Sequence, residues 1–404
     1  MASHGPLSGY RILDLTQFES GTVCTETLAW LGAEVIKVER PVKGELGRYS
    51  AAAPGVDTYG FLVMNMNKKS VTCNMKSPDG IQLIREILAK SDVIVENMGP
   101  GSINRLGLGY EDCKKINPKI IWASIKGFAT GSPYQDYPAF DPIATHTGGL
   151  VSSTGLPDMP IKPGVSVADS GTGLMCAMSI VSALLQRERE GIGQRIECAM
   201  QDFIIGLSRS NWEPYYNYGY SPRRAGNGMP LENVAPSNTY PCKPFGTNDY
   251  VHVYCSRAPG SKNFESLCRV IGREDLITDE RMKTPQSRYK YREELDKIIG
   301  GWCAQHTKQE AMDLLAGADV PAAAMLDISD FAHDPQYTDR GIVVEVDHPQ
   351  HGRIKLPGFA ANMSENHIEY TCSPALGGSN EEVYKGILGL SDEEFERLKA
   401  DKTI

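Results

Sequence analysis

The chain has 404 residues, a formal net charge of −9 at pH 7, 41% hydrophobic residues and 23% charged residues. This length predicts two domains, and the acidic balance argues against a nucleic-acid-binding protein, because such proteins usually carry a basic face. A small phosphorylated ligand is not excluded, since it needs only a few local cations and backbone N–H groups.

The ten cysteines are scattered and form no Cys-x-x-Cys pair. At this length the pattern indicates reduced intracellular thiols, not a disulfide framework or a zinc site. Arg11, Asp14 and Glu19 interrupt the first thirty residues, so no signal peptide is indicated, and no apolar run is long enough to span a bilayer. We therefore expect a cytoplasmic protein.

Strand and helix patterns alternate through the first 125 residues. Strands are expected at 10–15, 33–38, 92–96 and 120–124, and helices at 21–31, 81–88 and 110–116. Such alternation predicts βαβ units, a parallel sheet and right-handed crossovers. Ligands bind such sheets beyond the carboxyl ends of the strands.

Polar residues and glycines follow each of these strands. They include Thr16, Gln17, Glu19, Ser20, Glu39, Arg40, Asn97, Gly99, Lys126 and Gly127. A dinucleotide fingerprint and a Walker A sequence are both absent. Basic residues near these strand ends are candidates to face one phosphate, although most lysines are simply solvated: Lys37, Arg40, Lys68, Lys69, Lys76, Arg105 and Lys126.

Asp169 lies in the run Val165-Ser166-Val167-Ala168-Asp169-Ser170-Gly171. Val165 and Val167 indicate a strand, and residues 174–186 are apolar at helical spacing, which puts Asp169 at a strand-to-helix junction. The helix start should keep this carboxylate ionised, so that it is able to act as a nucleophile on an activated acyl group. From this segment alone, a helix N-cap is the stronger interpretation.

A second acid, Asp141, precedes Pro142. It fits a hydrogen-bonding role at a site and the start of a turn equally well. The eight histidines are dispersed without a metal-binding pattern, and no Gly-x-Ser-x-Gly hydrolase motif is present.

Composition changes after residue 200, and residues 225–330 are expected to form a second domain. Strands are expected there and beyond at 251–255, 341–346 and 354–356, and helices at 264–270, 292–306, 308–316 and 392–399.

Ordered segments along nearly the whole chain resemble the class III CoA-transferases, a family that also contains the α-methylacyl-CoA racemases. The matching runs are 7–16, 31–40, 95–98, 105–110, 123–128, 138–141, 169–173, 271–276, 334–336 and 374–377. The resemblance implies an α/β fold with a Rossmann-like parallel-sheet large domain (1–224) completed by the C-terminal segment (331–404), and a smaller α+β domain (225–330). It also implies an interlocked dimer, either a homodimer or a heteromer with a related subunit.

The resemblance assigns Asp169 as the nucleophile, which forms a mixed anhydride and then an aspartyl-CoA thioester. Coenzyme A is then a co-substrate, and the mechanism needs no metal and no tightly bound cofactor. By the same resemblance, Gln17 lies near the acyl group and Asp141 is the second acid. The CoA-binding positions it implies are Arg40, Asn97, Arg105 and Lys126.

Two positions and one segment depart from the family pattern. Gly99 stands where an arginine is usual and Gly378 where a glutamate is common. The family's glycine-rich lid has no clear counterpart, and residues 258–261 are the candidate replacement.

Two other functions compete with CoA transfer. A racemase needs a histidine just before the second acid, where this chain has Phe140, and His146 is a poor substitute. A non-catalytic partner subunit would lack the nucleophile, whereas Asp169 is present.

Within the family, the chain is most similar to subunits that move CoA from succinyl-CoA to (R)-benzylsuccinate in toluene degradation. An aromatic run is compatible with an aryl pocket and equally with surface packing: Trp212, Tyr215, Tyr216, Tyr218 and Tyr220. Arg223 and Arg224 are candidates to hold a second carboxylate.

Overall fold

The computed structural model describes residues 5–49, 55–229, 233–256 and 262–404. The chain forms two compact units: unit 1 contains residues 1–149, 164–207 and 335–404, and unit 2 contains 150–163 and 208–334. The sequence predicts the first boundary at residue 224. In the structure the second segment of unit 1 ends at Leu207, and residues 150–163 belong to unit 2. In unit 2 the Gly226 N–H donates to the Gly155 carbonyl at 2.9 Å, a tertiary contact that composition does not reveal.

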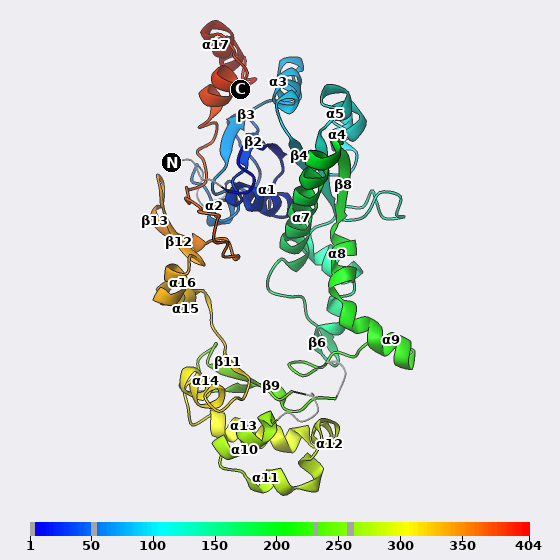
Figure 1. Ribbon diagram of the computed structural model, residues 1–404, viewed down its shortest axis with the longest axis vertical. Coiled ribbons are helices and arrows are strands. Elements are labelled where there is room, and N and C mark those ends of the chain that lie inside the picture. Colours follow the sequence, from blue (N-terminus) through cyan, green and yellow to red (C-terminus); the bar gives the residue numbers. More distant parts are fainter. Residues whose placement is uncertain (1–4, 50–54, 230–232, 257–261) are drawn as a thin grey trace. The chain divides into compact units, whose positions relative to one another are not determined.

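Unit 1 is built on a six-stranded parallel sheet with the order β3-β2-β1-β4-β5-β8 (Figure 1). This confirms the predicted α/β fold. The strands are β1 (Arg11–Leu15), β2 (Glu34–Glu39), β3 (Lys69–Thr72), β4 (Val93–Glu96), β5 (Ile121–Lys126) and β8 (Gln194–Ala199). Strand order reverses between β1 and β4, which is where sheets of this kind bind ligands.

The two edge strands are the ones that the sequence pattern missed. β3 (Lys69–Thr72) is short, and β8 (Gln194–Ala199) is mostly half-buried, so neither shows the cluster of buried apolar residues that marks the central strands. Their partners β2 and β5 do contain such clusters, at Val35-Ile36 and Ile121-Trp122-Ala123.

The helices of unit 1 follow mostly from apolar spacing and caps. In α3, Leu83, Ile84, Ile87 and Leu88 face the core, and the Ser77 hydroxyl caps the helix by accepting from Gly80 N–H. The helices are α1 (Ser20–Trp30), α2 (Tyr59–Leu62), α3 (Pro78–Ala89), α4 (Ser102–Arg105), α5 (Tyr110–Ile116), α6 (Asp141–Thr147), α7 (Val167–Glu190), α8 (Met200–Leu207), α16 (Pro335–Asp339), α17 (Asp392–Ala400) and a π-helical segment (Glu381–Ile387).

The strand expected around Val165 and Val167 is wrong, because Val167 already begins α7 and Ser166 is its N-cap residue. By length and composition α7 would be able to cross a membrane, contrary to the expectation from the sequence. However, Cys176, Ile180 and Leu184 are buried, and α7 packs closely on α1, as expected for the core helix of a globular protein.

The C-terminal segment returns to the sheet of unit 1. It contributes the hairpin of β12 (Val343–His348) and β13 (Gly352–Pro357), then runs beside β3. The Tyr384 hydroxyl donates to the Thr72 carbonyl at 2.8 Å, and Figure 1 shows α17 and the C-terminus near β3 and α3. Phe395 and Leu398 of α17 share one core cluster with the strands β1 to β4.

Unit 2 has its own core around a three-stranded antiparallel sheet with the order β11-β10-β9. Its strands are β6 (Gly155–Leu156), β7 (Met159–Pro160), β9 (Ser237–Pro241), β10 (Tyr250–Tyr254) and β11 (Ala322–Ala324). Its helices are α9 (Trp212–Tyr218), α10 (Asn263–Val270), α11 (Asp275–Thr278), α12 (Pro285–Lys290), α13 (Arg292–Cys303), α14 (Lys308–Ala316) and α15 (Ile328–His333), with 3₁₀ turns at Val151–Ser153, Arg209–Asn211 and Glu280–Met282.

Candidate active site

A cavity of about 350 Å³ lies at the carboxyl ends of β1, β4 and β5, at the point where the strand order reverses. It is contained within unit 1. Its polar lining includes Gln17, Glu19, Asn97, Lys126 and Asp169, and the rest of the wall is largely aromatic and apolar. Phe18 and Phe140 meet there edge to face, with ring centroids 6.2 Å apart. The fold thus brings the predicted nucleophile together with the loops that follow three strands.

Asp169 lies in the first turn of α7, two residues inside the helix, and is therefore not its N-cap. The Ser166 side chain makes no capping hydrogen bond. Instead, the carboxylate of Asp141 accepts from the N–H groups of Ala168 at 2.7 Å and Asp169 at 3.3 Å. Asp141 is buried and reaches the start of α7 from the first residue of α6. The second acid is therefore the cap of the helix that carries the first.

Burial and the nearby carboxylates of Glu19 and Asp141 raise the pKa of Asp169 to about 7. Hydrogen bonds to its carboxylate from the Asp141 backbone and from the Ser20 side chain oppose this shift. The expectation that the helix start keeps Asp169 fully ionised is therefore wrong, because two neighbouring acids and desolvation outweigh the helix N-terminus. At neutral pH the side chain is divided between a neutral acid and a nucleophilic carboxylate.

We expect Asp141→Ala to destabilise the protein by about 2 kcal/mol, because two N–H groups at the start of α7 lose their acceptor. Asp141→Asn, which keeps a carbonyl oxygen, should lose much less stability. Chemical denaturation measures both, and equal losses for the two variants would contradict a capping role.

Asn97 holds the loop that follows β1. Its side-chain oxygen accepts from Gln17 N–H at 2.9 Å, and its amide nitrogen donates to the Gln17 carbonyl at 2.8 Å. The amide predicted to bind CoA is thus engaged in positioning this loop. The Gln17 side chain is left to line the cavity.

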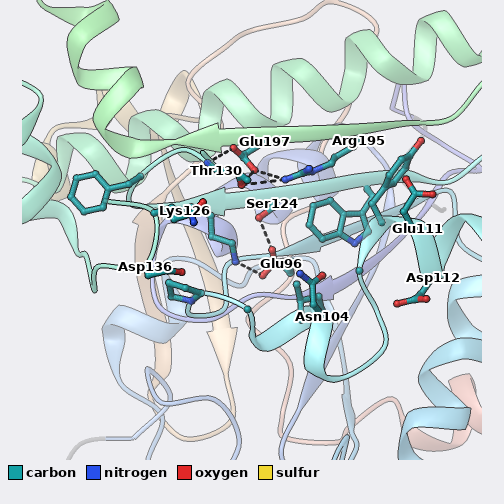
Figure 2. Close-up of a pocket in the computed structure, with 18 residues that line it drawn as sticks. Glu96, Asn104, Glu111, Asp112, Ser124, Lys126, Thr130, Asp136, Arg195 and Glu197 are labelled. Atoms are coloured by element: carbon teal, nitrogen blue, oxygen red, sulfur yellow. Dashed lines mark hydrogen bonds and ion pairs between the residues drawn. The ribbon is translucent and has the colours of Figure 1, made fainter. Parts of the chain in front are cut away.

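Lys126 ends β5 and lines both the Asp169 cavity and a second cavity of about 490 Å³. Its ammonium group donates to Glu96 at 2.8 Å and to the Met98 carbonyl at 2.5 Å. Figure 2 shows Lys126 pointing at Glu96, with the Arg195–Glu197 pair farther along the second cavity. Acids at this second cavity, including Glu111, Asp112 and Asp136, outnumber its cations, so phosphate groups are disfavoured there.

The remaining predicted CoA contacts are dispersed. Arg40 follows β2 and Arg105 ends α4; both are exposed, and neither lines these two cavities. Arg105 donates to the Ser102 hydroxyl at 2.9 Å. Two of the basic candidates, Lys37 and Lys68, are fully buried beside Glu45 and Asp14, and so are unable to face a phosphate.

Glu19 is the site residue that the prediction did not assign. It appeared among the polar residues after the first strand, but nothing in the sequence indicates that α1 and α7 meet. In the structure the Ser170 hydroxyl donates to the Glu19 carboxylate at 2.6 Å. Among the described residues, no group of three or more His, Cys, Asp or Glu side chains is arranged to hold a metal ion.

The aromatic run and Arg224 belong to unit 2. Trp212, Tyr216 and Tyr218 are exposed and line neither cavity described above. The Arg224 guanidinium donates to the carbonyls of Leu156 at 2.9 Å and Pro157 at 3.0 Å, which is a structural role. The candidate lid at 258–261 lies outside the described residues.

Comparison with known proteins gives a consistent family. The family model described as CoA-transferase family III matches residues 7–380. A protein named formyl-CoA:oxalate CoA-transferase from Bradyrhizobium diazoefficiens is 38% identical, covering 96% of this chain and 94% of the relative. One of the same name from Streptomyces coelicolor is 36% identical, covering 98% and 99%. Among solved structures, a CAIB/BAIF family protein from Brucella suis has a TM-score of 0.83 and 30% identity, covering 95% of this chain and 99% of that one.

Proposed function

Because the chain belongs to CoA-transferase family III, we propose that it moves CoA from an acyl-CoA to a carboxylic acid through covalent intermediates on Asp169. One observation supports the assignment above all others. The carboxyl group of Asp169, with a pKa of about 7, lies in a partly apolar cavity at the carboxyl ends of parallel strands. A carboxylate made basic by its surroundings is a suitable nucleophile for an acyl group.

The proposed reaction exchanges activated acyl groups. An oxygen of Asp169 attacks the thioester carbon of the donor, the carbon–sulfur bond breaks, and the electron pair leaves with the CoA thiolate. The thiolate then attacks the aspartyl carbonyl of the mixed anhydride, which gives an aspartyl-CoA thioester and frees the donor acid. The acceptor carboxylate attacks the aspartyl carbonyl of this thioester, which expels CoA thiolate and leaves a second mixed anhydride. The thiolate then attacks the acyl carbon of the acceptor, which forms the new acyl-CoA and releases the carboxylate of Asp169.

The surrounding residues have proposed roles in these steps. Asp141 fixes the start of α7 and with it the direction of Asp169. Gln17 is placed to hydrogen-bond the acyl carbonyl, since it lines the same cavity. Phe18 and Phe140 contribute apolar surface to the wall, although both rings are exposed to solvent in this structure. Exclusion of water matters at this site because the anhydride and the thioester both hydrolyse. Arg40, Arg105 and Lys126 remain the proposed contacts for the CoA phosphates.

The donor and acceptor acids are proposed from the names of the relatives and from the sequence resemblance. The relatives named formyl-CoA:oxalate CoA-transferase suggest formyl-CoA and oxalate. The prediction of succinyl-CoA and (R)-benzylsuccinate rests on the sequence resemblance alone. A panel that pairs both donors with oxalate, succinate, carnitine and arylsuccinates would distinguish these pairs, and transfer to oxalate but not to arylsuccinates would exclude the second.

Racemisation and a silent subunit role are less well supported. The position before Asp141 is Phe140, and His146 is exposed with Nδ1 2.5 Å from the Pro142 carbonyl oxygen, away from the lining of the Asp169 cavity. We retain an interlocked dimer, as homodimer or heteromer, and a cytoplasmic location as parts of the proposal. All ten cysteines are free, which fits a reducing compartment.

The intermediate itself provides the test. Incubation with acyl-CoA and hydroxylamine, followed by peptide mass spectrometry, should place a hydroxamate on Asp169. Because esters and anhydrides on other acids would react in the same way, every carboxylate of the chain is monitored. A hydroxamate on another residue, or on none with all donors in the panel, would remove the proposed mechanism.

A further inference from the structure

Glu19 lies beside the proposed nucleophile without having a role in the mechanism above. Its carboxylate accepts a hydrogen bond from the Ser170 hydroxyl at 2.6 Å, and Ser170 directly follows Asp169 in α7. Glu19 and Asp169 also line the same 350 Å³ cavity. Two carboxyl groups from distant parts of the sequence thus share one site.

Local backbone contacts hold the segment that carries Glu19. Phe18, just before it, has φ of 59°, a left-handed conformation that is unfavourable for a non-glycine residue. The Glu19 carbonyl accepts from the Thr22 hydroxyl at 2.8 Å and from Val23 N–H at 2.9 Å. The same loop is held from the other side by the Asn97 amide. Such constraints indicate that the direction of this side chain is fixed.

Close helix packing brings the two acids together. A Cβ atom added at Gly173 of α7 would lie 2.4 Å from the Ser20 carbonyl oxygen at the start of α1. Any larger residue at position 173 would push the helices apart. The glycine therefore allows the first turns of α1 and α7, with Glu19 and Asp169, to meet.

Few positive charges lie near the carboxylates of Glu19 and Asp169. Lys126 is the single cation among the described residues that line the cavity, and it pairs with Glu96 at 2.8 Å. The salt bridges of the described residues include none to Glu19 or Asp169. The other titratable groups facing Asp169 are Asp141, from the start of α6, and Tyr137, which lines the cavity. The site therefore places like charges together.

We propose that Glu19 is a positioning residue that acts through Asp169: its negative charge makes the nucleophile more basic and is relieved when Asp169 is acylated. This deepens the proposed function and rests on it. When the carbon–oxygen bond to Asp169 forms and the electron pair leaves with the CoA sulfur, the aspartyl group becomes neutral. The repulsion between the two carboxylates then ends, which favours acylation, and no proton needs to pass through Glu19.

The test compares Glu19→Gln with Glu19→Asp, and with Glu393→Gln on the exposed face of α17 as the matched control. Two readouts are followed from pH 5.5 to 9: single-turnover acylation, measured by rapid quench and mass spectrometry as the covalent adduct on Asp169, and carbodiimide labelling of Asp169 without acyl-CoA. Carbodiimide reacts with the protonated acid, so its titration does not depend on any enzymatic activity.

In the wild type, labelling should fall and acylation should rise through pH about 7, where Asp169 ionises. In Glu19→Gln the pH midpoint of Asp169 labelling should move down by about one pH unit, because a negative charge near Asp169 has been removed. Acylation should then be roughly threefold slower at pH 9, where a less basic carboxylate is a weaker nucleophile. At pH 5.5 it should be faster than in the wild type, because several times more of the variant is ionised.

Glu19→Asp should keep the wild-type midpoint, and Glu393→Gln should resemble the wild type in both readouts. An unchanged labelling midpoint in Glu19→Gln would overturn the proposal. So would a uniform loss of acylation at every pH, which is the signature of a merely structural role. A third outcome separates the two proposals: labelling shifts as expected, but no donor acylates Asp169. The electrostatic coupling of Glu19 and Asp169 is then confirmed, whereas the proposed function fails, and the catalytic use of the coupling fails with it.

Discussion

Replacing Asp169 with alanine is expected to abolish CoA transfer, with a loss in kcat of roughly 10⁴-fold or more, because the covalent steps lose their nucleophile. Acyl-CoA binding should change little, since the proposed phosphate contacts lie elsewhere. Formation of the acyl-CoA of the acceptor acid, separated by chromatography, measures transfer, and equilibrium binding of a non-hydrolysable acyl-CoA analogue measures affinity. Asp169→Asn should be equally inactive once spontaneous deamidation is excluded by mass spectrometry.

Asp169→Asn should also stabilise the fold at neutral and alkaline pH. A carboxyl whose pKa is raised from 3.8 to about 7 binds protons more tightly in the folded state than in the unfolded state. Stability therefore declines as pH rises from about 4 to 7. Asp169→Asn removes this penalty, so its free energy of unfolding should exceed that of the wild type by up to about 4 kcal/mol at pH 8, with little difference at pH 4. Retained activity in both variants, or a stability gain independent of pH, would contradict this account of Asp169.

Replacing Arg48 with methionine is expected to cost about 3–5 kcal/mol of stability, because it leaves buried charges without a partner. Arg48 is fully buried and pairs with Glu39 at 2.6 Å and Asp57 at 2.8 Å. Its guanidinium also donates twice to the Pro374 carbonyl, and it lies 3.8 Å from the centroid of the Phe61 ring. The C-terminal segment should therefore loosen first, which hydrogen exchange would detect near residues 371–380.

Arg397 provides a matched control for this prediction. It pairs with Asp79 at 2.9 Å, but both side chains are about half exposed. Solvent screens such a pair, so Arg397→Met should leave the melting temperature nearly unchanged. Similar losses for Arg48→Met and Arg397→Met would refute the idea that the buried network carries the stability.

Most of the sheet was predictable because burial leaves a direct pattern. The central strands around Ile12, Ile36, Ile94 and Ala123 carry short clusters of buried apolar residues, as expected for a sheet covered on both faces. The edge strands β3 and β8 were missed because such apolar clusters are weaker at an edge. The ordered segments likewise predicted the family, which the family model and the relatives confirm.

The site was predictable only in part. Asp169 and Asp141 were both predicted as site residues, which stays a prediction, but the sequence did not indicate that Asp141 caps the helix of Asp169, a relation between residues 28 positions apart. Asn97 was expected to bind CoA, and the structure engages its amide in the loop after β1. Glu19 lay unassigned among several polar residues because its significance depends on where α7 packs.

The sequence by itself determined the parallel α/β architecture and the family, because these follow from apolar periodicity and from residue types in a fixed order, and it predicts Asp169 as the nucleophile. The tertiary structure alone decided the electrostatic state of Asp169. A pKa depends on burial and on charges a few ångströms away, and the packing of α1 and α6 against α7 is what brings Glu19 and Asp141 to that distance. Distances between residues far apart in the chain cannot be read from the sequence. The sequence therefore singled out Asp169 but did not predict its raised pKa.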